Sequence, residues 1–303
     1  MITRDAITAE LAARLVAQQF PAWAGLPVVP VAESGWDNRT FRLGDTMTVR
    51  LPTAEYYVAA VEKEHTWLPR LAPHLPLPIP TPLALGTPGL GYPWPWSVRR
   101  WIDGRPATEE RIADLVELAD DLARFLVALW AADVPGGPAA GAHSFHRGGN
   151  LVVYDRETQA ALARLGGRVD AATATTLWEE ALAAHPPRAP VWFHGDVAAG
   201  NLLVDDDGRL SAVIDFGTSG VGDSACDLVI AWTLFDAPSR EAFRGGTALD
   251  EGAWARAAGW ALWKALITLA APAAAQIDRE GAERTLHRVL DDRGAAPRRQ
   301  ITR

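Results

Sequence analysis

The sequence predicts an α+β protein with two lobes: a small β-rich N-terminal lobe and a larger, mainly helical C-terminal lobe. The first observation is a group of short β-branched or alternating segments between residues 28 and 51. The second is the recurrence of apolar residues at helical spacing through much of the chain beyond residue 104. The turn signal Asp103-Gly104 separates the two patterns, so we expect the lobes to be 1–104 and 105–303.

The N-terminal lobe should begin with a helix over about 8–19 that Thr8 can cap. Three strands should follow, at 28–31, 39–43 and 47–51, and a fourth near 94–101 after the proline-rich segment 73–82. A second helix is expected over about 54–71, because one face of it carries Tyr57, Val61, Glu64, Leu68 and Leu71. Glu64 is the exception on this apolar face, since a buried carboxylate is unfavourable without a partner.

The C-terminal lobe should begin with a long helix capped by Thr108, with Glu109 and Glu110 in its first turn. Its buried face is expected to carry Ile112, Leu115, Ala119, Leu122, Leu126 and Leu129. A hairpin of 202–204 and 212–214 should join two polar motifs within an otherwise helical lobe. The segment 143-HSFHRGGN-150 is too irregular for a metal site, and we expect a surface loop there.

Composition limits the classes of function. The net charge of −8 argues against a general nucleic-acid binder, and it would suit a cationic small substrate. Lys264 and Pro272 interrupt the longest apolar stretch, 257–275, so this stretch should be a core helix and not a membrane span. Cys226 is the only cysteine, and the first twenty residues include the charged Arg4, Asp5, Glu10 and Arg14, so we expect a cytoplasmic protein.

Two polar motifs carry the chemistry: 194-HGDVAAGN-201 and 214-IDFG-217. The four residues between Asp196 and Asn201 let both side chains point at one place if the loop closes on itself. The hairpin between the motifs brings Asp215 back beside them. Either motif alone would be read as turns with Asx caps, but the order and the joining hairpin make the combination informative.

The residue types in these motifs suit phosphoryl transfer. Mg²⁺ prefers hard oxygen ligands, so Asp215 and Asn201 are the predicted metal ligands together with nucleotide phosphates. Asp196 is the predicted catalytic base, which orients a substrate hydroxyl and accepts its proton. His194 is expected to support the loop by hydrogen bonding.

The two motifs resemble those of the aminoglycoside phosphotransferase family, small-molecule relatives of the protein kinases. The resemblance runs from about residue 28 to 270, is strongest over 190–230, and implies a bilobal protein-kinase-like fold. It implies an ATP-dependent (or GTP-dependent) enzyme with Mg²⁺ that phosphorylates a hydroxyl of a small molecule, foremost an aminoglycoside-type antibiotic.

The resemblance also implies roles for further residues. Arg50, at a position where the family more often has lysine, should contact the nucleotide phosphates and pair with Glu64. The backbone around Arg100 and Ile102 should hold the adenine, and Asp227 should brace the catalytic loop. The loop 33–40 matches the one that covers the phosphates, through Ser34, Asp37 and Asn38, but a plain polar hairpin is an equal reading.

Other functions remain open at this stage. Related kinases act on macrolides, choline, homoserine and other small alcohols or amines. A nucleotide-binding pseudokinase is a third possibility, although the intact Asp196, Asn201 and Asp215 argue against it. The sequence does not identify the acceptor, its contact residues or the oligomeric state.

Overall fold

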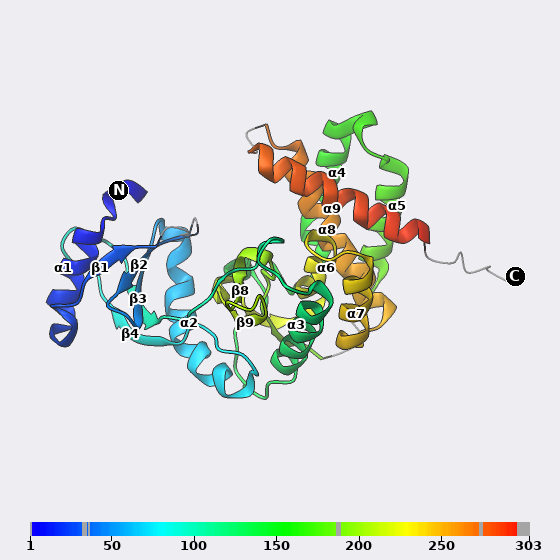
Figure 1. The fold of residues 1–303 in the computed structure, drawn as a ribbon. Helices are drawn as coiled ribbons and strands as arrows, with labels where there is room; N and C mark the ends of the chain where they lie inside the picture. The colour runs from blue at the N-terminus through cyan, green and yellow to red at the C-terminus, as the bar shows by residue number, and fades with distance from the viewer. Residues whose placement is uncertain (1, 32–34, 36, 186–188, 273–274, 296–303) are drawn as a thin grey trace, which may run out of the picture.

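The computed structural model describes residues 2–31, 35, 37–185, 189–272 and 275–295, with side chains through residue 292. A twisted sheet with two helices forms the N-terminal part, and helices dominate the C-terminal part (Figure 1). The predicted α+β class is therefore confirmed. The boundary near residue 104 stays a prediction.

The N-terminal sheet has five antiparallel strands in the order β1-β2-β3-β5-β4. Its strands are β1 (Val28–Pro30), β2 (Asn38–Leu43), β3 (Met47–Pro52), β4 (Pro82–Gly86) and β5 (Trp96–Arg100). The β-branched or alternating sequence pattern predicted four of these five strands. It missed β4, which follows the proline-rich segment and begins with a proline at the edge of the sheet, where a missing N–H is tolerated.

Two helices of the N-terminal part match the predictions. Helix α1 (Ala9–Gln19) begins after Thr8, whose hydroxyl accepts a hydrogen bond from the N–H of Leu11 at 3.2 Å. Helix α2 (Val58–Leu71) packs against β4 and β5. The predicted face of α2 is buried at Val61, Glu64, Leu68 and Leu71.

The C-terminal part holds seven described α-helices. They are α3 (Leu115–Trp130), α4 (Asp155–Leu165), α5 (Ala171–Ala183), α6 (Ile230–Thr233), α7 (Ala237–Thr247), α8 (Glu251–Ala270) and α9 (Gln276–Ala295). The long α8 packs against α4, α5 and α9, and its apolar residues are largely buried, as expected for a core helix. No helix in the described ranges is both long and apolar enough to cross a bilayer.

The prediction that α3 begins at Thr108 is wrong. The helix starts at Leu115, because Asp114 caps it by accepting from the N–H groups of Val116 and Glu117. The preceding residues instead form a turn held by the hairpin, where the N–H of Ala113 donates to the carbonyl of Gly208 at 3.2 Å. The buried residues of α3 are Leu118, Ala119, Leu122, Ala123, Phe125, Leu126 and Leu129.

Short strands support the two polar motifs. The predicted hairpin forms as β8 (Leu202–Val204) and β9 (Leu210–Val213), and β6 (Arg105–Pro106) extends it. Strand β7 (Val191–Phe193) leads into the first motif and pairs with β10 (Gly220–Gly222), which follows the second. Each of the two polar motifs thus lies between two strands that pair with the strands flanking the other motif.

The segment 143–150 is not a surface loop as expected. Gly148 packs so closely on β7 that a Cβ there would lie 2.1 Å from the ring of Phe193, and its φ of +74° favours glycine. The carbonyl of Gly148 accepts from the N–H of Asp223 at 2.8 Å, and Ser144 is fully buried. The paired glycines therefore allow this loop to pack into the C-terminal part.

Candidate active site

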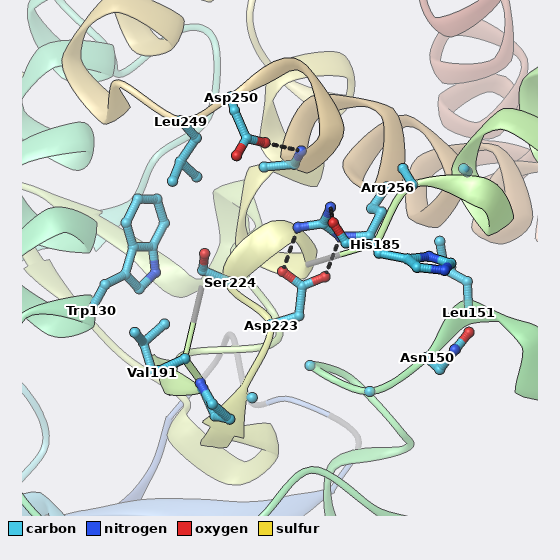
Figure 2. A pocket seen from close by; sticks show the side chains of 18 of the residues that line it. Trp130, Asn150, Leu151, His185, Val191, Asp223, Ser224, Leu249, Asp250 and Arg256 are labelled. Atoms are coloured by element: carbon cyan, nitrogen blue, oxygen red, sulfur yellow. Dashed lines mark hydrogen bonds and ion pairs between the residues drawn. The ribbon is translucent and has the colours of Figure 1, made fainter. Parts of the chain in front are cut away.

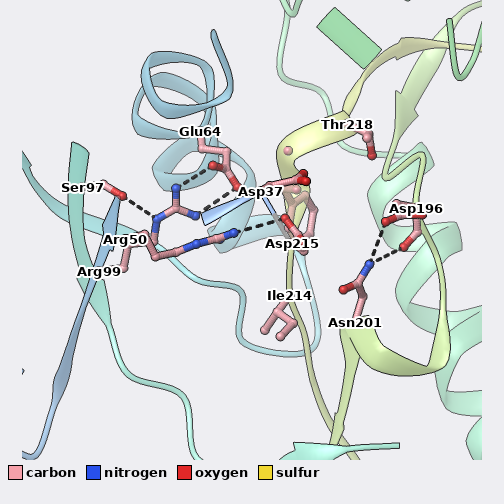
Figure 3. Close-up of polar contacts among 12 residues, drawn as sticks. Asp37, Arg50, Glu64, Ser97, Arg99, Asp196, Asn201, Ile214, Asp215 and Thr218 are labelled. Atoms are coloured by element: carbon pink, nitrogen blue, oxygen red, sulfur yellow. Dashed lines mark hydrogen bonds and ion pairs between the residues drawn. The ribbon is translucent and has the colours of Figure 1, made fainter. Parts of the chain in front are cut away.

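The loop after β7 presents Asp196 and Asn201 together. The Nδ2 of Asn201 donates to the Asp196 carboxylate at 3.1 Å and to its backbone carbonyl at 2.9 Å (Figure 3). Asp196 is exposed, whereas His194 and Gly195 beside it are buried. The loop thus closes on itself as predicted and leaves the Asp196 carboxylate accessible.

Asp215 follows β9 and lies beside this loop. The N–H of Ile214 donates to the carbonyl of Asn201 at 2.8 Å, which places the second motif against the first. Asp215 has φ +65° and ψ +68°, a left-handed conformation that is uncommon for a residue with a side chain. Such strain persists only where the surroundings enforce it, and it concentrates at functional sites.

Buried hydrogen bonds fix the loop 194–201 from behind. The Asp227 carboxylate accepts from the N–H of Gly195 at 2.7 Å, from the N–H of His194 at 3.1 Å and from the indole of Trp130 at 3.0 Å. Burial raises the pKa of Asp227, and these contacts oppose the rise. We infer that Asp227 braces the loop through its backbone.

The His194 ring links the two motifs. Its Nε2 lies 3.0 Å from the carbonyl of Ile214, and its Nδ1 lies 3.2 Å from the N–H of Asp196. A carbonyl only accepts and an N–H only donates, so the ring is neutral with its proton on Nε2. His194 is fully buried, so its contacts suit support of the loop and leave it no access to a substrate.

A Mg²⁺ ion bound to a nucleotide fits the free oxygens of this site. Among the described residues, no hydrogen bond occupies the Oδ1 of Asn201 or the Oδ2 of Asp215, and the Asp215 side chain is 31% exposed. No cluster of three or more His, Cys, Asp or Glu in the described ranges suits a metal. A site with two protein oxygens needs phosphate oxygens to complete it, which is the usual situation for Mg²⁺.

The expected pairing of Arg50 with Glu64 is wrong. Glu64 forms a two-pronged ion pair with Arg99, at 3.0 and 2.6 Å, and both side chains are almost completely buried (Figure 3). Arg50 instead contacts the Asp215 carboxylate at 3.4 Å. The sheet explains this arrangement: Thr48 pairs with Arg99 and Arg50 with Ser97, so both arginines leave the same face of adjacent strands.

The two arginines have different surroundings. The Nε of Arg99 donates to the hydroxyl of Ser97 at 2.9 Å, so this guanidinium is held on both sides. Burial disfavours the charge on Arg50, but the carboxylates of Asp215 and Glu64 outweigh burial and raise its pKa. For Glu64, burial is likewise outweighed by Arg99, and the pKa of the carboxyl is lowered.

A cavity of about 770 Å³ lies between the sheet and the two motifs. Most of the predicted nucleotide and metal residues line it: Asp37, Asn38, Arg50, Arg100, Ile102, Asn201 and Asp215. Glu64 does not line the cavity, and Ser34 is outside the described residues.

At the hinge, the N–H of Arg100 already donates to the carbonyl of Thr81, whereas the N–H of Ile102 has no backbone partner in the described ranges. A purine could therefore bond to Ile102.

The Asp37 carboxyl lines the cavity among other charged groups, and its predicted contact with the phosphates stays a prediction. Burial raises the pKa of its carboxyl, and the nearby charge of Asp215 raises it further, while a hydrogen bond from Tyr57 and the charge of Arg50 lower it. A carboxylate here would repel a bare phosphate. Asp37 therefore belongs to the charge balance of the site.

Sequence reasoning missed the role of Lys63. Its ammonium group donates to the carbonyls of Gly217 at 2.7 Å and Ser219 at 2.9 Å, both directly after Asp215. Its third contact is the Nδ1 of His143 at 3.2 Å, and the His143 Nε2 lies 2.9 Å from the Ala139 carbonyl. The position of Lys63 next to the expected core residue Glu64 was the only available signal, because its partners are far away in sequence.

We expect Lys63 to titrate near neutrality. Burial lowers its pKa from 10.5 to about 8, with Glu64 and Asp215 opposing. The chain has only two lysines, so a protein labelled with ¹³C-lysine gives two side-chain NMR signals, and the Lys264→Arg variant assigns them. The Lys63 signal should shift with a midpoint near pH 8; a midpoint above pH 10 would contradict its buried environment.

The sign of the effect on stability follows from this shift. Between pH 8 and 10.5 the unfolded chain binds more protons at Lys63 than the folded chain does. Raising the pH through this window therefore relieves an unfavourable buried charge, and the contribution of Lys63 to stability increases. Below pH 8 the lysine is charged in both states, and the contribution no longer changes.

A smaller cavity of about 310 Å³ lies in the C-terminal part (Figure 2). Asp223 and Arg256 form a buried ion pair on its wall, with bonds of 2.6 and 3.0 Å. None of the predicted site residues lines this cavity. Asp223 also starts the turn before Asp227 by accepting from the N–H of Ala225, so the pair has a structural explanation.

Comparisons with known proteins agree with this geometry. Residues 28–263 match the model of the phosphotransferase enzyme family. A GDP complex of wild-type aminoglycoside 2'-phosphotransferase-IIIa superposes with a TM-score of 0.71 at 19% identity, covering 94% of this chain and 99% of the other. Macrolide 2'-phosphotransferase from Brachybacterium faecium gives a TM-score of 0.58 at 24% identity, covering 92% and 97%. A search of curated protein sequences found no significant match.

Proposed function

This chain belongs to the phosphotransferase enzyme family, and on that premise we propose that it transfers the terminal phosphoryl group of ATP or GTP to a hydroxyl of a small molecule. The observation that carries the proposal is the exposed Asp196 carboxylate, which is held by Asn201, a residue that lines the large cavity together with Asp215. The oxygen of the acceptor hydroxyl would attack the γ-phosphorus. The bond from that phosphorus to the β-phosphate oxygen would break, and the nucleoside diphosphate would leave.

Asp196 is the proposed base in this reaction. Its carboxylate would orient the hydroxyl and take its proton as the new O–P bond forms. Hydrogen bonds from Asn201 fix the carboxylate, and Asp227 fixes the backbone that carries it. Preorganisation of this kind favours catalysis, because little reordering is left for the transition state.

The nucleotide is proposed to lie in the large cavity, with its base at Ile102 and its phosphates toward Arg50 and Asp215. Asn201 and Asp215 would hold Mg²⁺, which neutralises charge on the phosphates when it is bound. ATP and GTP both suit a hinge that offers backbone groups, and the solved relatives include complexes with GDP, ADP and ATP.

The acceptor is a small molecule with a hydroxyl. The sequence first suggested an aminoglycoside, and solved relatives include complexes with kanamycin and with streptomycin. Macrolides and small choline-like or homoserine-like compounds are the alternatives, and a pseudokinase would bind nucleotide without turnover. These classes differ in charge and apolar surface, so one acceptor panel separates them.

The test measures nucleotide turnover and phosphate transfer with labelled ATP and GTP, with and without Mg²⁺. We expect Mg²⁺-dependent transfer, and at least a tenfold loss of Mg²⁺ affinity in Asp215→Asn, since losing even an outer-shell partner costs about 10- to 100-fold. Asp207→Asn, in the exposed hairpin turn, is the matched control. Nucleotide binding with no turnover, with or without an acceptor, would favour the pseudokinase.

A further inference from the structure

The loop 143–150 holds Arg147 in a strained and well-anchored position. Phe145 and His146, directly before it, both have positive φ angles, of +51° and +55°. Two consecutive non-glycine residues in this region are unfavourable unless the surroundings enforce them. The hydroxyl of Tyr154 donates to the carbonyl of Phe145 at 2.8 Å, and the next residue, Gly148, is fixed against β7. Arg147 is therefore positioned by the fold.

The Arg147 guanidinium lies on an aromatic cluster. Its central carbon is 5.0 Å from the ring centroid of Trp263 and 5.4 Å from that of Trp260, and Tyr154 stacks on Trp263 at 4.0 Å. Its Nη1 atom is buried and has no hydrogen-bond partner. No carboxylate in the described ranges forms an ion pair with Arg147. An unsatisfied donor on a buried charged group is costly, and an anionic oxygen would satisfy it.

Lys264 is a second cation on the helix face that carries the two tryptophans under Arg147. It lies at the i+4 position from Trp260 and directly after Trp263 on α8, is exposed, and its ammonium group forms no hydrogen bond or ion pair with any described residue. Its pKa is lowered by desolvation first and by Arg147 next, while Asp196 opposes the shift. Lys264 thus lies within electrostatic range of both Arg147 and the proposed base.

The carboxylates around Lys264 leave the pKa of its ammonium group lowered. Asp278 and Glu157 also act on Lys264, but their combined effect with Asp196 does not cancel desolvation and Arg147. Glu157 is engaged elsewhere, because it accepts from the indole of Trp263 at 2.9 Å. Arg147 disfavours the charge on Lys264, and an anion bound between the two cations would relieve that repulsion.

We propose that Arg147 and Lys264 bind a carboxylate or phosphate group of the acceptor and so direct its hydroxyl to Asp196. This inference rests on the proposed phosphotransferase function and specifies its substrate class: a hydroxylated small molecule that carries an acidic group. A polycationic aminoglycoside would meet two cations that form no ion pair with a described carboxylate. Tyr56 and Phe145, whose rings lie 5.1 Å apart, add aromatic surface, and Tyr56 is 64% exposed.

The experiment uses acceptors of one size that differ in charge. The probes are 4-(hydroxymethyl)benzoate, its methyl ester, 4-(hydroxymethyl)benzylamine and 4-(hydroxymethyl)phenyl phosphate, with kanamycin as the polycation. The full chain is assayed for phosphate transfer from labelled ATP. Saturation-transfer NMR with a non-hydrolysable ATP analogue measures binding of each probe independently of turnover. The benzoate and phosphate probes distinguish the two acidic groups.

We expect the carboxylate or the phosphate probe to exceed the ester and the amine by at least about tenfold in kcat/KM, as one charge-assisted hydrogen bond allows. Lys264→Met should remove most of this preference by raising KM, and Lys264→Arg should retain it. Arg147→Met should also reduce the preference for the acidic probe by raising KM. Arg124→Met, which removes an exposed charge on α3, is the matched control and should behave as wild type.

The outcomes distinguish a failure of this inference from a failure of the proposed phosphotransferase function on which it rests. Asp196-dependent transfer with a preference for the ester, the amine or kanamycin would overturn the acidic-acceptor inference alone. Equal binding of all the probes, binding of none of them, or an unchanged preference in Lys264→Met would do the same. Acidic probes that bind through Lys264 but are never phosphorylated would support the anion site while contradicting the proposed phosphotransferase function.

Discussion

Replacing Asp196 with asparagine should lower kcat by about 10²- to 10⁴-fold, the range expected when a general base is lost. The substitution keeps the shape of the side chain, and its Oδ1 can still accept the hydrogen bond from Asn201. What it removes is the ability to take the proton of the acceptor hydroxyl. The affinity for nucleotide should stay within about threefold, because Asp196 does not line the nucleotide cavity.

The measurement is single-turnover phosphate transfer together with nucleotide binding by calorimetry, on wild type and Asp196→Asn. Asp207→Asn makes the same chemical change in the exposed β8–β9 turn and should leave both quantities unchanged. A fall in kcat smaller than tenfold would show that Asp196 is not the base. A parallel loss of nucleotide affinity would instead place Asp196 in the nucleotide site.

The sequence predicted that Asp196, Asn201 and Asp215 lie close together because their geometry is local. Asp196 and Asn201 lie in one short loop, and a hairpin with a tight turn returns the chain to Asp215. Such units depend on spacing and turn residues, which a sequence displays directly. The same reasoning succeeded for α2, whose buried face follows from a simple repeat.

The partner of Glu64 could not be predicted in this way. The repeat showed that Glu64 is buried and needs a cation, but either β3 or β5 could supply the arginine. The choice depends on the strand order and on the register that places Arg99 opposite Thr48. Both are properties of the assembled sheet, and no local pattern encodes them.

Two other predictions from the sequence, the start of α3 and the conformation of the segment 143–150, were wrong for one physical reason. The start of α3 moved because the β8–β9 turn bonds to Ala113, and the loop 143–150 is partly buried because Gly148 fits against Phe193. In each case a segment distant in the sequence decided the local conformation. The proposed anion site was hidden for the same reason, since Arg147 and Lys264 are 117 residues apart in the sequence and Arg147 reaches the tryptophans of α8 only in the folded structure.

Breaking the buried Glu64–Arg99 pair should cost about 3–5 kcal/mol of unfolding free energy, because either single change leaves an uncompensated buried charge. We expect this for Glu64→Leu and for Arg99→Met, measured by urea unfolding at pH 7. The double variant should lose much less than the sum of the two, since no charge is then stranded. The exposed pair Arg105–Asp206, with side chains 67% and 94% exposed, is the control and should show little coupling.

This cycle also decides which arginine is the partner of Glu64. If Arg50 were the main partner, Arg99→Met would be tolerated, and Arg50→Met would show the large coupling with Glu64→Leu. The distances predict the reverse, because Glu64 bonds to Arg99 at 2.6 and 3.0 Å, while Arg50 bonds to Asp215. Arg50→Met should therefore weaken nucleotide binding with a smaller loss of stability. Arg99 would then fix α2 to the sheet and leave Arg50 available for the phosphates.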